Sequence, residues 1–394
     1  MIKVLFVTYD FPYPLTSGGK NRAYNMMKFA KSSSVSIDLL SFVREGFDPK
    51  DIDRIRKIGV SDIQVYKRRK LKSALTLSKN MFSAGSIFKT LYYDKDFEKL
   101  LIEIIKKNNI DIVHFESSYV GYYISDKLRR MGVKQILGTE NIEHLLYKEF
   151  LDNSKNILKK SALSYQVNRF KKEEHDMMEK ADICIAVTKN EADYISEVTG
   201  KKSYLVENAI SVKDLKFKFE DNVKHNILFV GNFAYMPNIQ AINYFVGKVL
   251  PLLDHKITLT IVGKRVREIV PDSRQIIALE YVDDLIEEYR KADLMVFPIK
   301  IGGGTNYKVL EAMALGIPVV AFPDKVNSIG AKENIDYFKV VNESEFAEKI
   351  ELIMKNKTIA TKIVESARRL VEENYSWEVV GLKLSKVWKD LANG

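Results

Sequence analysis

Cysteine is almost absent from this sequence of 394 residues, in which Cys184 stands alone. A single cysteine excludes an internal disulfide and is typical of a reducing cytoplasm. Long apolar runs are also lacking, and no stretch approaches the roughly 20 residues that span a bilayer. The five histidines show no metal-ligand spacing, so we expect no bound metal. Neither first βα turn reads Gly-x-Gly-x-x-Gly, which disfavours a dinucleotide oxidoreductase.

The length of the chain and its apolar content of 46% are ample for two domains with separate cores. Charge is divided unevenly along the chain. Residues 1–180 hold 33 Lys and Arg against 22 Asp and Glu, a net charge of +11, whereas the remainder holds 29 against 30. This excess suggests that the first half meets an anionic membrane surface or nucleic acid. The alternative is a generally lysine-rich composition.

Short β-branched runs alternate with longer amphipathic stretches, and the alternation restarts once. Continuous apolar strands separated by helices predict a parallel sheet covered on both faces. We therefore predict an α/β fold of two doubly wound, Rossmann-like domains, at residues 1–207 and 208–375, which face a central ligand cleft. A terminal helix at 376–394 must bury Trp377 and Trp388, and we expect it to cross back to the first domain. The predicted strands are 2–8, 35–40, 111–116, 134–139 and 182–187 in the first series and 226–231, 257–263, 276–279, 293–298 and 318–322 in the second.

The segment 298–322, PIKIGGGTNYKVLEAMALGIPVVAF, is the most informative part of the chain. Three glycines lead into a helix whose first N–H groups can bind an anion, with Thr305 and Asn306 as N-cap residues. Lys308 and Glu311 lie three residues apart, on one face of this helix and between apolar neighbours. The segment therefore predicts a phosphate-binding helix N-terminus. The alternative is a glycine-rich turn followed by an ordinary ion pair.

The string KVLEAMALGIPVVA resembles the donor-binding signature of retaining glycosyltransferases of the family 4 type, which have the GT-B fold. FVTYDFPYPLTSGGKNR resembles the family's glycine loop, and KADICIAVTKNEADYI followed by VENAI resembles the end of its first domain. The resemblance implies a metal-independent hexosyltransferase without a cofactor, whose first domain (1–207) binds the acceptor and whose second domain (208–375) binds the nucleotide sugar. Such an enzyme moves a sugar from a nucleotide diphosphate sugar to a glycan or lipid-linked acceptor, and we expect a role in bacterial-type cell-surface polysaccharide synthesis.

The resemblance also assigns donor-binding residues, with two departures. Glu311 corresponds to the glutamate that binds the nucleotide ribose, but Gly303 stands where the family has a second glutamate that contacts the sugar. Asn232 and Asn238 stand where the family has cations that hold the diphosphate, so Lys308 and then Lys264 are the candidates for that task. Backbone N–H groups of Gly303, Gly304, Thr305 and Asn306 are expected to contact the sugar, and Gly18 and Gly19 to face the diphosphate, although glycines also suit a tight turn.

Four residues that end or follow predicted strands of the first domain are candidates for catalysis. His114 and Glu116 lie on the same side of the strand 111–116, where the family usually has two histidines. Asn141 and Glu143 match a family segment that has a histidine where Glu140 stands. Two alternatives remain open. A lone buried histidine is often a hydrogen-bonded core residue, and Asn followed by Glu also suits a helix N-terminus.

The basic run KRRK at 67–70 precedes an amphipathic stretch that extends to Tyr93. This segment suits either an anionic bilayer surface or a helix that faces the core. We expect a cytoplasmic protein, with peripheral contact to the inner face of the membrane as a further hypothesis. A nucleotide-sugar epimerase is the competing enzyme. A nucleic-acid-binding protein is the competing class, but the interleaved aromatic motifs of such modules are missing, so we expect no nucleic-acid partner.

Overall fold

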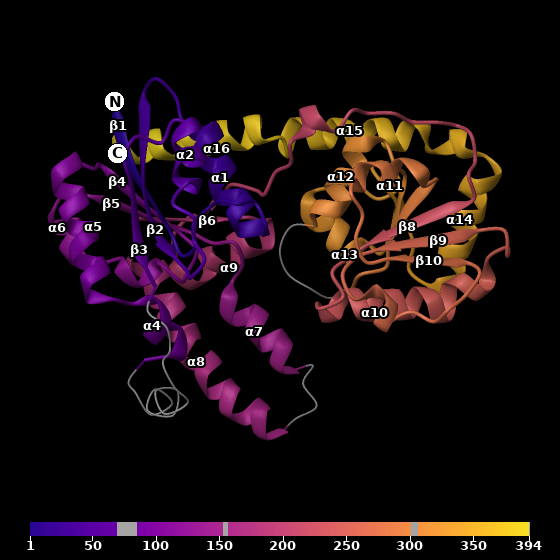
Figure 1. The fold of residues 1–394 in the computed structure, drawn as a ribbon, viewed down its shortest axis with the longest axis horizontal. Coiled ribbons are helices and arrows are strands. Elements are labelled where there is room, and N and C mark those ends of the chain that lie inside the picture. Colours follow the sequence, from indigo (N-terminus) through magenta and orange to yellow (C-terminus); the bar gives the residue numbers. More distant parts are fainter. Residues whose placement is uncertain (69–84, 153–156, 301–305, 394) are drawn as a thin grey trace. The chain divides into compact units, whose positions relative to one another are not determined.

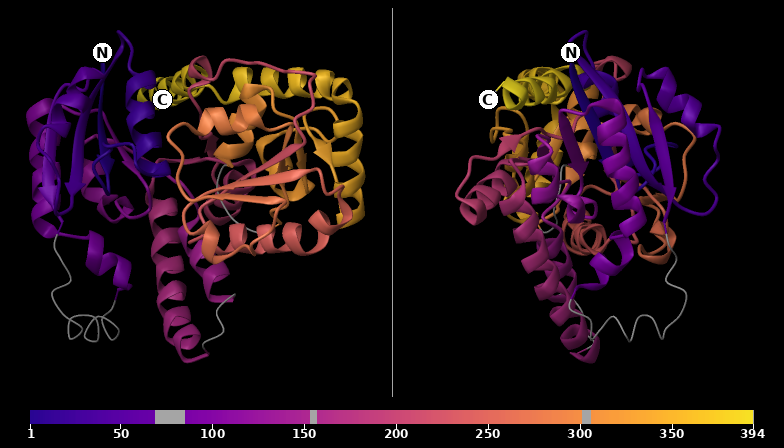
Figure 2. Two further views of the ribbon diagram at one scale, coloured as in Figure 1. Left: turned by 45° about the vertical axis from the view of Figure 1, so that its right-hand side comes forward. Right: turned by 90° about the vertical axis from the view of Figure 1, so that its left-hand side faces the viewer.

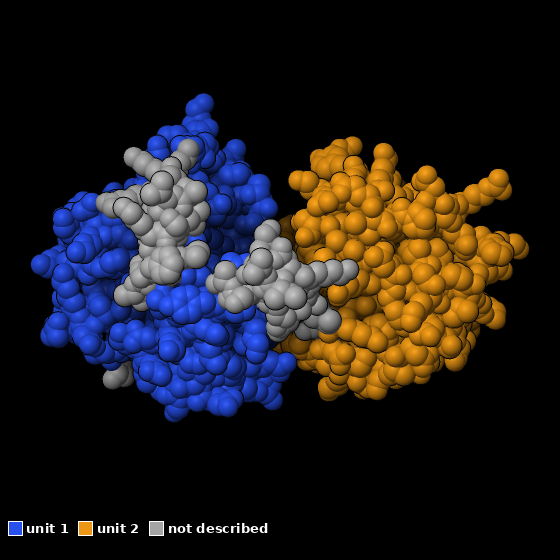
Figure 3. All heavy atoms as spheres, turned by 90° about the horizontal axis from the view of Figure 1, so that it is seen from below, with its two compact units in different colours: residues 1–208, 377–394 blue, residues 209–376 orange. Residues whose placement is uncertain are grey.

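The computed structural model describes residues 1–68, 85–152, 157–300 and 306–393. The chain forms two compact units. Unit 1 comprises residues 1–208 together with 377–394, and unit 2 comprises residues 209–376 (Figure 3).

Unit 1 is built on a sheet of seven parallel strands in the order β3-β2-β1-β4-β5-β6-β7 (Figure 1). Every residue of β4 is buried, as is expected for a central parallel strand that helices cover on both faces. The strands are β1 (Ile2–Thr8), β2 (Val35–Val43), β3 (Ile63–Lys67), β4 (Ile112–Glu116), β5 (Lys134–Gly138), β6 (Ile183–Ala186) and β7 (Tyr204–Leu205).

Local signals in the sequence mark the helix ends of unit 1. In α9, Thr188 and Glu191 form a capping box, and Gly200 ends the helix in the left-handed conformation. Helices α7 and α8 form a hairpin that extends away from the sheet (Figures 1 and 2). The helices are α1 (Gly18–Ala30), α2 (Asp51–Lys57), α4 (Ile87–Tyr92), α5 (Lys95–Asn108), α6 (Asp126–Arg130), α7 (Glu143–Asp152), α8 (Ile157–Lys180), α9 (Lys189–Thr199) and the C-terminal α16 (Trp377–Asn393).

Helix α16 packs on α1 within unit 1. Trp377 and Trp388 are both buried there. Gly381 allows the two helices to approach closely, because a Cβ at this position would lie 2.5 Å from the backbone carbon of Phe29. The last helix of the chain is therefore part of the first unit.

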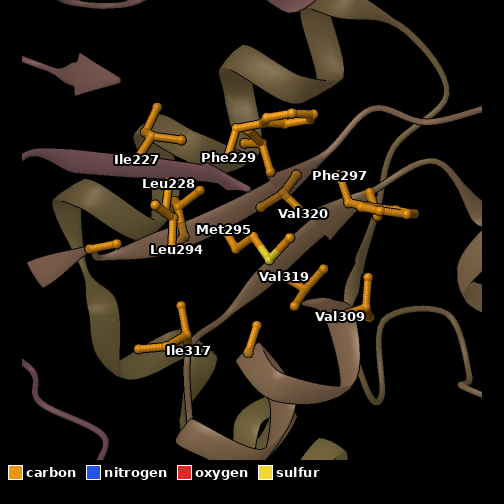
Figure 4. Close-up of a cluster of buried hydrophobic side chains, with 14 of the residues drawn as sticks. Ile227, Leu228, Phe229, Leu294, Met295, Phe297, Val309, Ile317, Val319 and Val320 are labelled. Atoms are coloured by element: carbon orange, nitrogen blue, oxygen red, sulfur yellow. The ribbon is translucent and has the colours of Figure 1, made fainter. Parts of the chain in front are cut away.

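Unit 2 contains a second parallel sheet, with the strand order β10-β9-β8-β11-β12-β13. Its apolar core lies between this sheet and its helices, and includes Phe229, Met295, Val309 and Val319 (Figure 4). The strands are β8 (Asn226–Val230), β9 (Thr258–Val262), β10 (Ile276–Leu279), β11 (Leu294–Phe297), β12 (Val319–Ala321) and β13 (Phe338–Lys339). The helices are α10 (Met236–Tyr244), α11 (Leu285–Lys291), α12 (Tyr307–Leu315), α13 (Pro323–Val326), α14 (Glu343–Lys355) and α15 (Thr361–Asn374).

These two parallel sheets with flanking helices confirm the predicted α/β class with two Rossmann-like domains. The predicted strands 2–8 and 276–279 coincide with β1 and β10. The predicted strand 35–40 is shorter than β2, which extends to Val43, and each of the other predicted strands contains a strand of the structure. Three short strands, β3, β7 and β13, were not predicted. Each lies outside the central strands of its sheet and lacks a long apolar run.

Replacing Gly381 with alanine should destabilise unit 1. The added methyl group collides with the backbone of α1, and we expect it to lower the free energy of unfolding by about 1–3 kcal/mol despite the better helix propensity of alanine. Both tryptophans of the chain lie in α16, so tryptophan fluorescence during urea unfolding reports on this unit. Leu382→Ala is the control, since Leu382 is 70% exposed on the same helix. Equal stability of the two variants would contradict the close approach of α16 and α1.

Candidate functional site

Each sheet has one point at which its strand order reverses, between β1 and β4 in unit 1 and between β8 and β11 in unit 2. Ligands of open α/β sheets bind outside the carboxyl ends of the strands at such points. The predicted donor residues of unit 2 follow β9 and β11, and the predicted catalytic residues of unit 1 end β4 or follow β5. The structure therefore places the described residues of each predicted set at the carboxyl-end edge of its own sheet.

Lys308 is a half-buried lysine in the first turn of α12. Its Nζ donates a hydrogen bond to Oδ1 of Asn238 at 2.8 Å and lies 5.3 and 5.5 Å from the ring centres of Phe229 and Phe297. Among the described residues, no ion pair joins Lys308 to a carboxylate. Burial lowers the pKa of Lys308 to about 7, although the charge of Glu311 opposes the shift. A bound anion would stabilise the charged form of such an amine.

Asn238 places this amine beside the loop that follows β8. Its side-chain nitrogen donates to the backbone oxygen of Asn232 at 2.8 Å, while its oxygen accepts from Lys308. These two asparagines are the residues that stand where the resembling family has diphosphate-binding cations. A lysine from α12 thus occupies the neighbourhood of those cations, which supports the predicted donor role of Lys308.

Glu311 lies one turn further along α12. The hydroxyl of Tyr289 is 3.1 Å from its Oε2 and 3.2 Å from the backbone oxygen of Lys308. Burial raises the pKa of Glu311, although the hydrogen bond from Tyr289 opposes the shift. Lys308 and Glu311 therefore have different partners, and the alternative of a surface ion pair between them is not what the structure shows.

The loops after β8 and β9 approach each other through glycine. Gly263 has a φ of 156°, and a Cβ there would lie 1.7 Å from the backbone oxygen of Gly231. The backbone N–H of Phe233 donates to the oxygen of Lys264 at 3.2 Å. The Lys264 side chain itself is exposed, and its donor role remains a prediction.

The predicted sugar contacts of Gly303, Gly304 and Thr305 lie outside the described residues. Asn306 is described and occupies the N-cap position of α12, but its side chain makes no capping bond; its backbone oxygen accepts from the N–H of Val309 at 2.9 Å.

In unit 1, His114 and Glu116 belong to a buried polar network. Arg22 Nε donates to Glu116 Oε1 at 2.7 Å, and His114 Nε2 lies 2.8 Å from Glu116 Oε2. The indole nitrogen of Trp388 lies 3.1 Å from His114 Nδ1. Since an indole N–H can only donate, Nδ1 accepts, and Nε2 carries the proton that is donated to Glu116.

This network leaves no open position on either predicted catalytic residue of β4. Both ring nitrogens of His114 and both carboxylate oxygens of Glu116 have partners, and the two side chains are 0% and 1% exposed. Burial alone would raise the pKa of Glu116, but the charge of Arg22 and the bond from His114 lower it to about 2. The contacts favour a positioning role that connects α1, β4 and α16, and catalysis by these residues remains a prediction.

Asn141 and Glu143 lie at the start of α7. The carboxylate of Glu174 accepts from the backbone N–H groups of Glu143 and His144 at 3.1 and 3.2 Å, so Glu174 caps this helix. The Glu143 side chain instead accepts from Asn141 and, at 2.9 Å, from the hydroxyl of Tyr119. Burial and the charge of Glu174 raise the pKa of Glu143 to about 7.

Glu140 also lies at this edge of the sheet of unit 1. The sequence named it only as the residue that stands where the family has a histidine. Its carboxylate lies against the first turn of α1, where a Cβ on Gly19 would be 2.6 Å from both carboxylate oxygens. Burial and the charge of Glu116 raise the pKa of Glu140 to about 8. The glycine predicted to face a diphosphate therefore also leaves room for this carboxyl group. Gly18, the first residue of α1, is exposed.

Sequence reasoning missed Arg22 and Tyr289 as well. Arg22 lies four residues before Met26 on the buried side of α1, and this break in an apolar stripe was the available signal. Tyr289 is similarly a buried residue of α11, beside charged neighbours in the sequence.

The described part of the chain contains no group of three His, Cys, Asp or Glu residues placed to hold a metal ion. Its helices include none that is long and apolar enough to cross a bilayer. The basic amphipathic stretch is described only in part, because residues 69–84 lie outside the described residues. In α4, the ring of Phe88 packs 4.3 Å from that of Phe170, which favours the core-facing alternative for this helix.

Comparison with known proteins connects the chain to an activity. Residues 224–356 match a family described as "Glycosyl transferases group 1". The chain is a glycosyltransferase with the GT-B fold. A protein from the cps region of Klebsiella pneumoniae is 24% identical over 99% of this chain and 100% of that one. A glycosyltransferase of Methanocaldococcus jannaschii is 23% identical over 98% of each chain.

Solved structures agree in fold at low sequence identity. Sucrose-phosphate synthase from Thermosynechococcus elongatus has a TM-score of 0.69 at 14% identity and covers 99% of each chain. TarM has a TM-score of 0.68 at 14% identity, over 100% of this chain and 99% of its own. HepE of Anabaena, solved in complex with UDP, has a TM-score of 0.66 at 10% identity over 99% of this chain and 100% of its own.

Donor affinity should fall as pH rises above about 7, because the amine of Lys308 must be protonated to hold an anion. A nearby diphosphate raises the pKa of this amine, so binding takes up a proton when the pH exceeds 7. We expect calorimetry with a nucleotide sugar to show a loss of up to about tenfold per pH unit in this range. The number of protons taken up on binding is obtained by comparing the binding enthalpies measured in two buffers that differ in ionisation enthalpy. Lys308→Met should remove the slope and Lys264→Met should keep it; a slope that survives in Lys308→Met would contradict the assignment.

Proposed function

We propose that this glycosyltransferase is a retaining, metal-independent hexosyltransferase of the family 4 type. It takes a sugar from a nucleotide diphosphate sugar and transfers it to a glycan or lipid-linked acceptor in cell-surface polysaccharide synthesis. The observation that carries the proposal is the half-buried pair of Lys308 and Glu311 at the start of α12. Lys308 lacks a carboxylate partner among the described residues and suits a diphosphate, and Glu311 one turn further suits ribose hydroxyls.

The known proteins support the donor class and the polysaccharide role in this proposal. The Klebsiella relative belongs to a cps region. HepE has been solved with UDP and with UDP-glucose, and a TarM mutant from S. aureus with UDP and α-GlcNAc-glycerol. We therefore propose UDP-sugars as the first donors to test.

In the proposed reaction, an acceptor hydroxyl oxygen bonds to the anomeric carbon while the bond from that carbon to the diphosphate oxygen breaks. The leaving diphosphate takes the electron pair and then the acceptor proton on the same face of the sugar. No strong general base is needed. The task of the protein is to orient the donor and to stabilise the charge that builds on the diphosphate, which the N–H groups at the start of α12 and the ammonium of Lys308 are suited to do.

A panel of UDP-, GDP-, dTDP- and ADP-sugars, with and without membrane extract, tests the activity through nucleotide release followed by mass spectrometry. We expect release from a UDP-sugar, enhanced by the extract, and a product whose anomeric proton coupling matches that of the donor. Failure to bind or consume any donor would overturn the proposal, and an inverted product would overturn retention.

Glu311→Ala should weaken donor binding about tenfold or more, because the ribose loses a charged hydrogen-bond partner. Tyr289→Phe is the matched control, since it removes only the hydroxyl that contacts Glu311 and should cost less. Calorimetry at constant pH measures both affinities, and a circular dichroism melt confirms that unit 2 remains folded. Unchanged affinity in Glu311→Ala would remove this residue from the donor site.

We also propose a cytoplasmic location with peripheral contact to an anionic membrane. The support is the net charge of +11 over residues 1–180. Sedimentation with vesicles tests it: binding is expected with anionic lipid at low salt, and neither with neutral lipid nor at high salt. Equal binding to neutral vesicles would contradict an electrostatic contact.

A further inference from the structure

A cavity of about 470 Å³ opens at the ligand-binding edge of unit 1. One wall is the loop 9–17 between β1 and α1, and the other is the loop 44–51 between β2 and α2. It lies wholly within unit 1, in a different unit from Lys308 and Glu311. No role assigned above uses it.

Three half-buried aromatic side chains of this cavity are held in place by other rings. Tyr9 contacts Tyr119 edge-on, with ring centres 5.3 Å apart. Phe47 packs edge-on against the buried Phe11 at 4.8 Å. Their fixed orientation suits a flat apolar face, such as the C–H face of a sugar ring, at little cost in side-chain entropy.

Tyr13 is fixed in a similar way. Its ring lies 6.3 Å from that of Tyr24, and the guanidinium of Arg54 lies 5.9 Å from its centre. The cavity thus presents ring surfaces that are already ordered without a ligand.

The polar group of the cavity is the carboxylate of Asp10, which is 16% exposed. Its Oδ1 accepts from the backbone N–H of Phe11 at 3.2 Å. Its Oδ2 lies 3.3 Å from the guanidinium of Arg44 and 3.8 Å from the amine of Lys20. Distances of this length leave Oδ2 able to accept a hydroxyl, while Arg44 and Lys20 can donate to a neighbouring one. A vicinal diol matches such an arrangement.

The charges of the lining disfavour an anionic ligand. Three carboxylates, Asp10, Glu45 and Asp51, stand against two cations, Lys20 and Arg44. Sites for phosphate or diphosphate head groups carry an excess of cations or free N–H groups. The cavity therefore suits a ligand with hydroxyl groups and apolar ring faces and without charge.

We propose that this cavity binds the acceptor by an uncharged saccharide end, with Asp10 and Arg44 reading adjacent hydroxyls between the walls formed by Tyr9, Tyr13 and Phe47. The inference rests on the proposed transferase function and narrows its acceptor from a glycan or lipid-linked molecule to one that presents a neutral glycan terminus.

Saturation-transfer NMR and calorimetry on the full chain without donor test the binding, with maltose, lactose and diacetylchitobiose as saccharide probes and inorganic pyrophosphate as the head-group probe. We expect at least one disaccharide to bind in this cavity and pyrophosphate not to bind there. Asp10→Ala and Phe47→Ala should each weaken saccharide binding about tenfold or more. Asp10→Asn, which keeps an acceptor for the N–H of Phe11, should weaken it less.

Asp272→Ala is the matched control. Asp272 lines a cavity of about 560 Å³ in unit 2 that has charged side chains but no aromatic ring among its described lining residues, so saccharide affinity should not change. If Asp10→Ala lowers the tryptophan-monitored stability of unit 1, Arg44→Ala replaces it, because that side chain is 51% exposed. Saccharide binding that survives in these variants, or pyrophosphate binding that they abolish, overturns the proposal.

A donor assay separates this inference from the function on which it rests. Nucleotide release by the wild type measures the transferase function by itself. In the Asp10 and Arg44 variants we expect the acceptor KM to rise, whereas Asp272→Ala should leave it unchanged. If the wild type consumes no donor but still binds saccharide in this cavity, the transferase function fails and the saccharide site stands. If donor is consumed and the acceptor KM is unchanged by the variants, the saccharide site fails alone.

Discussion

The buried guanidinium of Arg22 is the constraint on which unit 1 depends. A charge removed from water is tolerated only when it is paired and fully hydrogen-bonded. Arg22 meets this condition with Glu116 of β4, with the backbone oxygens of Val206 and Glu207, and with the side chain of Asn208. One side chain therefore fixes α1, the end of β4 and the last residues of the chain before unit 2.

The same network reaches the C-terminal helix by two routes. Glu116 contacts His114, whose other ring nitrogen accepts from Trp388, and Glu207 accepts from Lys383 at 2.9 and 3.0 Å. Truncating a member would leave a buried polar group without its partner, which costs more than the bond itself contributes. This is why α16 belongs to unit 1 although the whole of unit 2 precedes it in sequence.

Lys308 in unit 2 is a half-buried cation in the opposite condition. Arg22 has a carboxylate at 2.7 Å, whereas Lys308 has an amide oxygen and two ring faces. These neighbours are too weak to offset desolvation, so the pKa falls to about 7. A cation with a complete set of partners supports the fold, and one that lacks an anion is ready to bind a ligand. The contrast distinguishes the structural cluster of unit 1 from the candidate donor site of unit 2.

The sequence was sufficient to predict the longer buried strands and the residues that follow them, because such strands are continuous apolar runs and their carboxyl ends carry the ligand loops. The short edge strands β3, β7 and β13 lack such runs and were not predicted. Lys308 and Glu311 could be paired by helical spacing. Their actual partners could not, since Asn238 and Tyr289 come from other helices and reach them only through packing. Arg22 was hidden for the same reason, as its partners lie as far away as residue 208.

The two carboxyl groups that follow β5 show what burial adds to the sequence. Glu140 and Glu143 count as negative charges in the composition, yet burial raises their pKa values to about 8 and about 7. At neutral pH they therefore carry much less negative charge than two exposed glutamates would. Glu140 lies against Gly19, where the family resemblance expects a diphosphate. A neutral carboxyl group there can donate a hydrogen bond to a phosphate or hydroxyl oxygen, whereas an ionised one would repel the phosphate.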